Sequence, residues 1–198
     1  MDILALLDEL RIMARNALPY VQDPYDHTRY TRILELVQLY YGAALDLPPA
    51  DVRQRLAAEL GRVTPKVGAN AAIFDQHGDI LLMCRSDSQQ WCLPGGLVEV
   101  SETPMDTAVR EAQEETGLAC RPLQLVDFFT RPAGIHAGPH SLIAVVYLCE
   151  VIGGTLHGSP EGLEVRYWPL AEVRDWNTDH QAQARAAHSC WLARQTAA

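Results

Sequence analysis

The chain has 198 residues, of which 48% are hydrophobic and 21% charged, a composition typical of globular proteins. Its formal net charge of −9, without any run of basic residues, argues against a broad, non-specific hold on nucleic acid. The sequence shows no signal segment and no stretch of about 18 apolar residues that could cross a membrane. The 5 cysteines are odd in number and form no CxxC pair, so we expect reduced thiols and a cytoplasmic protein.

Residues 1–62 carry the pattern of a small all-α module. Apolar side chains recur at helical spacing over residues 3–18 and again over 23–45, with prolines near the ends of both segments. A shorter third helix is expected over residues 50–60. Because three short helices bury only a marginal core, we expect this module to lean on the rest of the chain or on a second copy, and we predict a homodimer.

From residue 66 onward the pattern changes to strands alternating with helices. It predicts strands over residues 67–74, 80–84, 123–129, 142–150 and 164–168, a short helix over 170–176 and a closing helix over 179–194. This alternation is typical of an α/β domain with a mixed sheet and helices on both faces. The chain therefore divides into a helical module, 1–62, and an α/β domain, 66–198.

An unusually acidic helix is predicted over residues 103–116. Thr103 followed by Pro104 is typical of a helix start, and Gly117 of a helix end. Three carboxylates, those of Glu111, Glu114 and Glu115, are spaced to share one stripe of this helix. Such a cluster, without a neighbouring His or Cys, favours Mg²⁺ or Mn²⁺ over zinc, the alternative being a solvated acidic face.

The full spacing adds a second argument. Gly96 is followed by five residues and Glu102, then by seven residues and the run Arg110-Glu111-Ala112, and after Gln113 by Glu114-Glu115, Thr116, Gly117 and Leu118. This pattern resembles the signature of the Nudix hydrolases. Ser101, where Gly is common, and the small Ala112, where a bulky aliphatic residue is usual, depart from it without touching a metal ligand.

The resemblance implies an α/β/α Nudix sandwich and assigns roles to residues of the box. Glu111, Glu114 and Glu115 would bind metal together with the carbonyl of Gly95, while Arg110 and Glu102 would hold the loop and the helix together. Divalent ions bridging a diphosphate would neutralise its charge and lower the pKa of a bound water, so that a carboxylate could take the proton. That base lies either in the box or in a later loop, where Glu161 is the candidate; the alternative for Glu161 is a solvated loop acid.

Residues 6–36 resemble the helical module that precedes the Nudix domain in a subgroup acting on nucleoside diphosphates linked to another group, such as CDP-choline and ADP-ribose pyrophosphatases. The resemblance implies a small nucleotide substrate and the products nucleoside monophosphate and X-phosphate. Candidates for substrate contact in the module are Tyr25, Arg29 and Tyr30, which could instead pack the helices. His136 and His140 lie in a Gly/Pro-rich loop where a substrate contact or plain exposure is expected.

The same signature leaves two other functions open. One is hydrolysis of RNA ends or of free nucleoside triphosphates, which needs the same metal box. The other is a non-catalytic nucleotide sensor, since a fold alone does not fix a function. A whole box and the lack of a basic patch favour the enzyme acting on a nucleotide-linked diphosphate.

Overall fold

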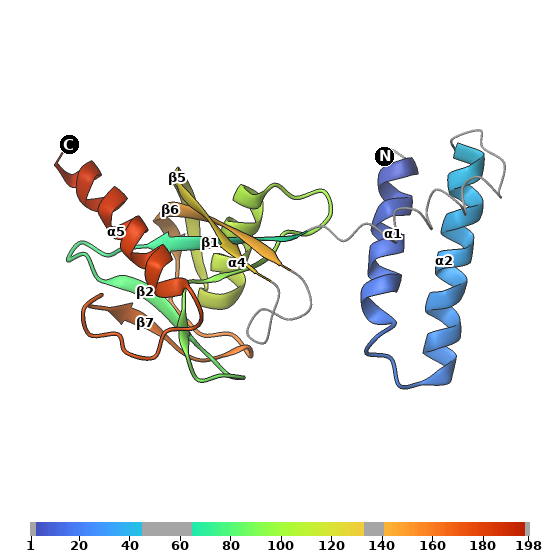
Figure 1. The fold of residues 1–198 in the computed structure, drawn as a ribbon, viewed down its shortest axis with the longest axis horizontal. Coiled ribbons are helices and arrows are strands. Elements are labelled where there is room, and N and C mark those ends of the chain that lie inside the picture. The colour runs from blue at the N-terminus through green and yellow to red at the C-terminus, as the bar shows by residue number, and fades with distance from the viewer. Residues whose placement is uncertain (1–2, 45–64, 133–140, 197–198) are drawn as a thin grey trace. The chain divides into compact units, whose positions relative to one another are not determined.

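The computed structural model describes residues 3–44, 65–132 and 141–196 (Figure 1). The chain divides into two compact units, Met1–Val63 and Thr64–Ala198, and each is described by itself. The helix expected over residues 50–60, His136 and His140 lie outside the described residues.

The first unit contains two helices that pack against each other, α1 (Ile3–Ala17) and α2 (Pro24–Ala44). The start of α2 is set by Asp23, whose Oδ1 accepts a hydrogen bond from the Tyr25 amide at 2.7 Å. Pro24 takes the first helical position, where its missing N–H leaves no bond unmade. Both predicted helices are confirmed, and their apolar stripes bury Leu7, Ala14 and Val37.

The described strands of the second unit form two sheets. A four-stranded mixed sheet has the order β4 (Gly95–Leu97), β1 (Lys66–Ile73), β6 (Leu142–Gly154) and β5 (Leu118–Arg131), with β1 parallel to β6 and the other pairs antiparallel. A three-stranded antiparallel sheet has the order β3 (Trp91–Cys92), β2 (Ile80–Arg85) and β7 (Gly162–Trp168). The predicted mixed sheet is confirmed, and the antiparallel sheet accompanies it.

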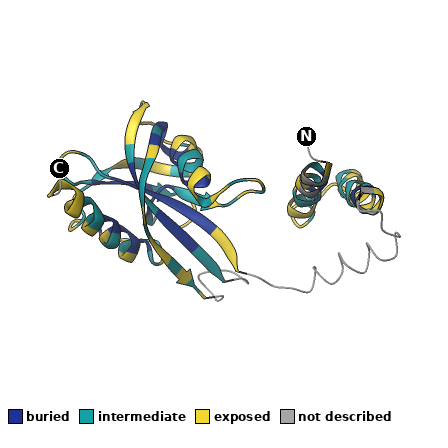
Figure 2. Ribbon diagram, turned by 90° about the horizontal axis from the view of Figure 1, so that it is seen from above, coloured by how far each residue is buried: buried dark blue, intermediate teal, exposed yellow. Residues whose placement is uncertain are grey.

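Strand β1 separates two hydrophobic clusters, because successive side chains of a strand point to opposite faces. Ala69, Ala71 and Ile73 join the cluster that includes residues of α4 (Pro104–Thr116), whereas Ala72 joins the cluster that includes residues of α5 (His180–Gln195). Figure 2 shows this interior as dark blue on the central strands. The α/β/α arrangement expected from the sequence is confirmed.

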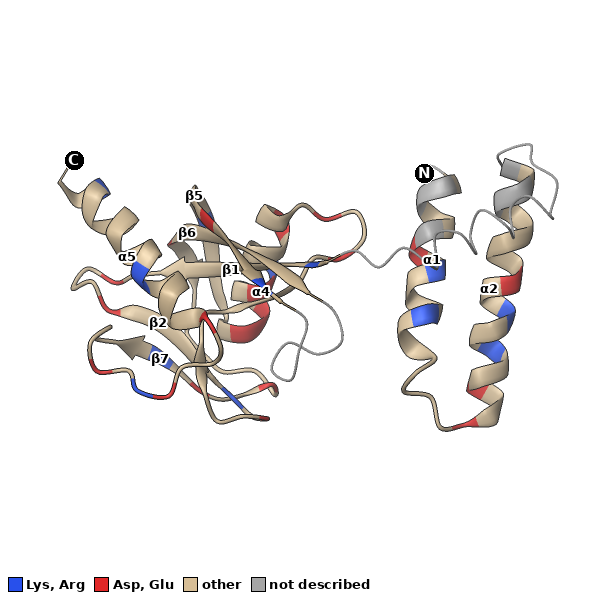
Figure 3. Ribbon diagram, viewed as in Figure 1, with Lys and Arg blue, Asp and Glu red and all other residues tan. Residues whose placement is uncertain are grey.

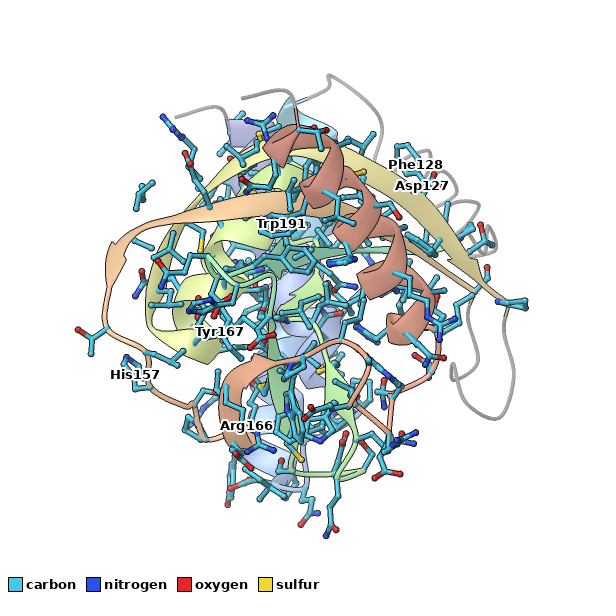
Figure 4. The ribbon with its side chains drawn as sticks, turned by 90° about the vertical axis from the view of Figure 1, so that its left-hand side faces the viewer. Asp127, Phe128, His157, Arg166, Tyr167 and Trp191 are labelled. Carbon is cyan, nitrogen blue, oxygen red and sulfur yellow. The ribbon has the colours of Figure 1, made fainter. Side chains whose placement is uncertain are left out.

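Strand β7 follows the same alternation (Figure 4). Tyr167 packs against the α4 cluster, while the guanidinium of Arg166 lies 3.6 Å from the centre of the Trp168 ring. The Trp168 ring in turn meets Trp91 edge-on at 5.2 Å between ring centroids. This cation–aromatic group covers one side of the small sheet.

The short helix predicted over residues 170–176 is wrong. Only a turn follows Pro169, and Trp176 then forms a parallel bridge with Trp91. The Trp91 amide donates to the Asp175 carbonyl at 2.7 Å, and the Asn177 amide donates to the Trp91 carbonyl at 2.9 Å. The end of this segment therefore makes its backbone hydrogen bonds with β3 instead of continuing as a helix.

Strand β5 begins five residues earlier than predicted, at Leu118 rather than Leu123. Pro122 lies inside it and disguises the strand in the sequence, since proline cannot donate to a sheet ladder. The pairing register shifts between Pro122 and Gln124, and β5 is the edge strand, the place where proline is tolerated.

The cysteines are all free thiols. Burial raises the pKa of Cys92 and Cys149 to about 12 and that of Cys120 to about 11, so these thiols stay protonated at neutral pH. Among the helices that the structure describes, none has the length and apolar content needed to span a bilayer.

Candidate active site

The acidic helix α4 has well-formed ends, as its sequence predicts. Thr103 and Asp106 form a capping box: the Asp106 amide donates to Thr103 Oγ1 at 3.2 Å, and the Thr103 amide donates to Asp106 Oδ2 at 3.0 Å. At the other end Gly117 has φ 74°, a left-handed conformation suited to glycine, and its amide donates to the Gln113 carbonyl. These ends fix which residues face the sheet.

Arg110 connects three carboxylates around α4. Its Nε and one terminal nitrogen donate to the two oxygens of Glu102 at 2.6 and 3.0 Å. The other terminal nitrogen donates to Glu111 at 2.8 Å and to Glu114 at 3.0 Å. The Arg110 bonds, with a bond from Thr107, lower the pKa of Glu102 to about 2. This geometry ties the loop before α4 to the helix, and Figure 3 shows the acidic residues of α4 in red.

Glu115 is buried against the strand end that precedes the box. Its side chain is only 5% exposed, and its Oε2 accepts a hydrogen bond from the Gly95 amide at 2.8 Å. Burial is the main cause that raises the pKa of Glu115 to about 8. The hydrogen bond from Gly95 opposes this rise, and the charges of Glu111 and Glu161 support it. The carboxylate therefore lies in a setting that favours a nearby positive charge.

The two glycines of the box are required by close approach. A Cβ on Gly96 would lie 2.1 Å from Glu111 Oε1, and a Cβ on Gly95 would lie 2.4 Å from the Ala69 carbonyl oxygen and 2.0 Å from Asn70 Oδ1. All three distances are far below van der Waals contact. The missing side chains let β4 lie directly against β1 and let Glu111 approach the backbone of the loop.

The loop between β6 and β7 brings Glu161 toward the same acidic group. The His157 amide donates to the Thr116 carbonyl at the end of α4 at 2.9 Å, and the Ser86 amide donates to the Glu161 carbonyl at 3.0 Å. Figure 4 shows His157 on this loop. Glu161 contributes to the raised pKa of both Glu111 and Glu115, which places its charge within electrostatic reach of the two carboxylates.

The residues present suit a hard divalent cation. Their side chains offer oxygen ligands alone, and the buried Glu115 beside the charges of Glu111 and Glu161 favours a nearby positive charge. In the part of the chain that the structure describes, no three His, Cys, Asp or Glu side chains already converge as a formed metal site. Glu111 and Glu114 instead share Arg110, which would have to release them in part for a metal to be held.

The other predicted substrate residues lie in the helical unit or outside the described residues. Tyr25 is 75% exposed, so it does not serve the packing of α1 on α2. Arg29 is also exposed and pairs with Asp26 at 2.6 Å, while Tyr30 is half-buried. His136 lies outside the described residues, as does His140.

The structure also brings residues to the site that the sequence did not single out. Arg85, at the end of β2, lies close enough to Glu115 to oppose the rise in the pKa of that carboxylate. Its guanidinium donates twice to Asp87, at 2.9 and 2.6 Å. A cavity of about 150 Å³ opens beside Gly95 and Gly96, lined in part by Arg85 and His180. Only the short Arg-x-Asp spacing of Arg85 and Asp87 could have drawn attention to this region in the sequence.

Comparison with known proteins agrees with this geometry. The NUDIX domain family matches residues 64–192. YjhB of Bacillus subtilis (strain 168) is 31% identical over 149 residues, which cover 73% of this chain and 70% of YjhB. An ADP-ribose pyrophosphatase of Methanocaldococcus jannaschii is 29% identical over 119 residues, covering 59% of this chain and 69% of that enzyme.

A solved structure, that of a UDP-X diphosphatase, has the same fold over most of the chain. It superposes with a TM-score of 0.60 at 21% identity, covering 96% of this chain and 93% of the other. The family match spans nearly all of the unit that carries the capped acidic helix, the two close-packed glycines and the Arg110–Glu102 pair. This chain belongs to the Nudix family and is a Nudix hydrolase.

Proposed function

We propose that this protein is a metal-dependent pyrophosphohydrolase that cleaves a nucleoside diphosphate linked to another group, of the CDP-choline or ADP-ribose type, to a nucleoside monophosphate and X-phosphate. The observation that carries the proposal is the buried Glu115, held by the Gly95 amide beside Glu111 and within electrostatic reach of Glu161. A diphosphate and this acidic group can meet only with positive charge between them. Mg²⁺ or Mn²⁺ fits these oxygen ligands.

Within this proposal the residues of the chain have separate tasks. Glu111, Glu114, Glu115 and the carbonyl of Gly95 would hold the metal, which when bound would neutralise the diphosphate and activate water. Arg110 and Glu102 would keep the loop and α4 in register through their paired hydrogen bonds. Glu161 would accept the proton of the attacking water, since it reaches the acidic group from a separate loop.

Three observations favour a nucleotide-linked diphosphate over RNA ends or free triphosphates. The net charge of −9 disfavours a long polyanion. The M. jannaschii relative is named for ADP-ribose. The helices α1 and α2 carry the stretch whose sequence resembles the module of the CDP-choline and ADP-ribose subgroup.

The test is a panel of candidate substrates with products identified by mass spectrometry. ADP-ribose, CDP-choline, nucleoside triphosphates and 5′-triphosphate RNA would be incubated with the protein and Mg²⁺ or Mn²⁺. The proposal expects nucleoside monophosphate and X-phosphate from the first two. Release of pyrophosphate from triphosphates alone, or binding without turnover of any member, would refute it in favour of one of the other two functions.

We further propose that the helical unit makes the protein a homodimer and selects substrate through Tyr25, Arg29 or Tyr30. The unit leaves large apolar side chains exposed on both helices, among them Ile3, Met13, Leu39 and Tyr40. The free thiols of the α/β domain suit a reducing compartment such as the cytoplasm. Light scattering and the substrate panel, applied to a chain that begins at Thr64, test this role. A dimer with an unchanged substrate profile would remove the helical unit from both tasks.

A further inference from the structure

The cavity that opens beside Gly95 and Gly96 has the size of a ring rather than of a whole nucleotide. Its volume is about 150 Å³, whereas sites for complete drug-sized ligands span about 300–1,000 Å³. Glycine backbone, apolar side chains and a few polar groups line it. The lining residues that matter for the argument are Arg85, Leu93, Gly95, Arg131 and His180. It adjoins Gly95 directly, so a group bound in it would be joined to a diphosphate at the acidic helix.

His180, the first residue of α5, faces this cavity with one fixed proton. The residue is only 7% exposed, and its Nδ1 accepts a hydrogen bond from the Leu93 amide at 3.1 Å. An accepting Nδ1 carries no proton, so in the neutral ring the proton is on Nε2. Burial, and then the charge of Arg131, lower the pKa of His180 to about 4, which keeps the ring neutral under physiological conditions.

The Nε2 of His180 is a donor that no acceptor among the described residues satisfies. Only the Leu93 bond is made by the imidazole ring. His180 lines the cavity, so its ring can be reached by a ligand placed there. A buried ring with one free, fixed donor is suited to an acceptor atom on a bound ligand.

The charges around the cavity are already balanced. Arg85 is held by Asp87 through two hydrogen bonds, and Arg131 is paired with Asp179. A phosphate placed in the cavity would therefore find a neutral imidazole and two arginines committed to carboxylates. A neutral planar ring with acceptor atoms on its edge fits both the charge and the narrow, glycine-lined space.

We propose that His180 is a specificity-determining residue, which donates its Nε2 proton to an acceptor atom of the substrate's nucleobase in this cavity. The inference rests on the proposed function and extends it, because it names the part of the substrate that the cavity reads. In this proposal the start of α5 selects the base, whereas the acidic helix contacts only the diphosphate.

The test holds X constant and varies the base. ADP-, CDP-, GDP- and UDP-glucose would be compared with the same diphosphate bearing ribose without a base. His180→Asn is the main variant, because its Oδ1 can still accept from the Leu93 amide while nothing replaces Nε2. The change Gln181→Ala, at the half-buried neighbouring residue, is the matched control.

For His180→Asn we expect kcat/KM to fall about tenfold or more on the base that the wild type prefers and to stay within about twofold on the base-free substrate. The base preference should collapse, while Gln181→Ala keeps it. A uniform fall on all five substrates would show that His180 only supports Leu93 and the loop, and would overturn the proposal. An unchanged preference would overturn it as well.

A binding measurement separates this inference from the proposed function. If the wild type cleaves none of the diphosphates, the proposed function fails, and titration of the four nucleoside monophosphates by calorimetry still tests His180. The proposal expects a base-dependent affinity that His180→Asn weakens. It also expects the ¹⁵N resonance of Nε2 in the wild type, which requires no variant, to shift on binding. Neither effect appearing would overturn the inference.

Discussion

Substituting the two adjacent box glycines by alanine should separate stability from activity. A Cβ at position 95 meets backbone: it would lie 2.4 Å from the Ala69 carbonyl oxygen and 2.8 Å from Asn70 Cα. These contacts are about 1 Å too short, and strands β1 and β4, paired through Asn70 and Gly95, cannot yield without breaking their ladder. We expect Gly95→Ala to lower the free energy of unfolding by roughly 2–4 kcal/mol, from overpacking and lost strand pairing.

A Cβ at position 96 meets only the far end of a side chain. Its nearest atoms are the carboxylate atoms of Glu111, at 2.1, 2.5 and 3.0 Å. That carboxylate ends a flexible side chain and can rotate away at the cost of its hydrogen bond with Arg110, so Gly96→Ala should lower the free energy of unfolding by only about 1 kcal/mol. The displaced Glu111 would leave its place near Glu115, and kcat should fall by about 10²-fold or more.

The assay is urea unfolding of both variants, followed by steady-state kinetics with ADP-ribose and titration of Mg²⁺. Each variant serves as the control for the other, since the same methyl group is added to neighbouring residues. Wild-type unfolding of Gly95→Ala would refute the backbone contact between β1 and β4. Full activity and metal affinity of Gly96→Ala would show that the position of Glu111 does not matter for catalysis.

Five further predictions test the metal and individual residues. Excess EDTA should abolish turnover, and Glu114→Gln should cut kcat by orders of magnitude without unfolding the protein, as measured by kinetics and circular dichroism. Glu161→Gln should lower kcat with little effect on metal affinity; reduced affinity would make Glu161 a ligand, and no effect would place the base in the box. Ser101 has φ 72°, so Ser101→Gly should raise the free energy of unfolding by about 1 kcal/mol. Arg110 lowers the pKa of Glu102 from 4.5 to about 2, so the ionised Glu102 stabilises the folded state fully above pH 4.5, and this stabilisation is lost as the pH falls toward 2. The urea midpoints of Glu102→Gln and of the wild type should therefore converge over that range.

What the sequence predicted well is local along the chain. The ends of α4 follow from Thr103, Pro104 and Gly117, and the carboxylate stripe follows from helical spacing. The contact of Arg110 with Glu102 spans eight residues and lies within the same motif. Short-range chemistry of this kind is visible without a fold.

What the sequence could not supply depends on residues brought together by the sheets. His180 and Leu93 are 87 positions apart, and the buried amide pair of Asn70 and Gln183 spans 113. Nothing in the spacing of the seven histidines distinguishes His180 from the rest. The non-helical path of residues 170–176 was also hidden, because Asp175 and Asn177 exchange backbone bonds with Trp91, far away in the chain.

One departure from the family signature, the small Ala112, has a physical explanation in the packing of α4. Ala112 is fully buried in the same cluster as Ala108, Ala69 and Ala71, so small side chains meet where α4 lies against β1. Helices that meet a sheet through alanines can approach it closely. That close approach lets the helix backbone bring Glu115 within 2.8 Å of the Gly95 amide. A bulky residue in place of Ala112 would push α4 away from β1. The small Ala112 and the alanines of β1 therefore act together to place the Glu115 carboxylate against the Gly95 amide.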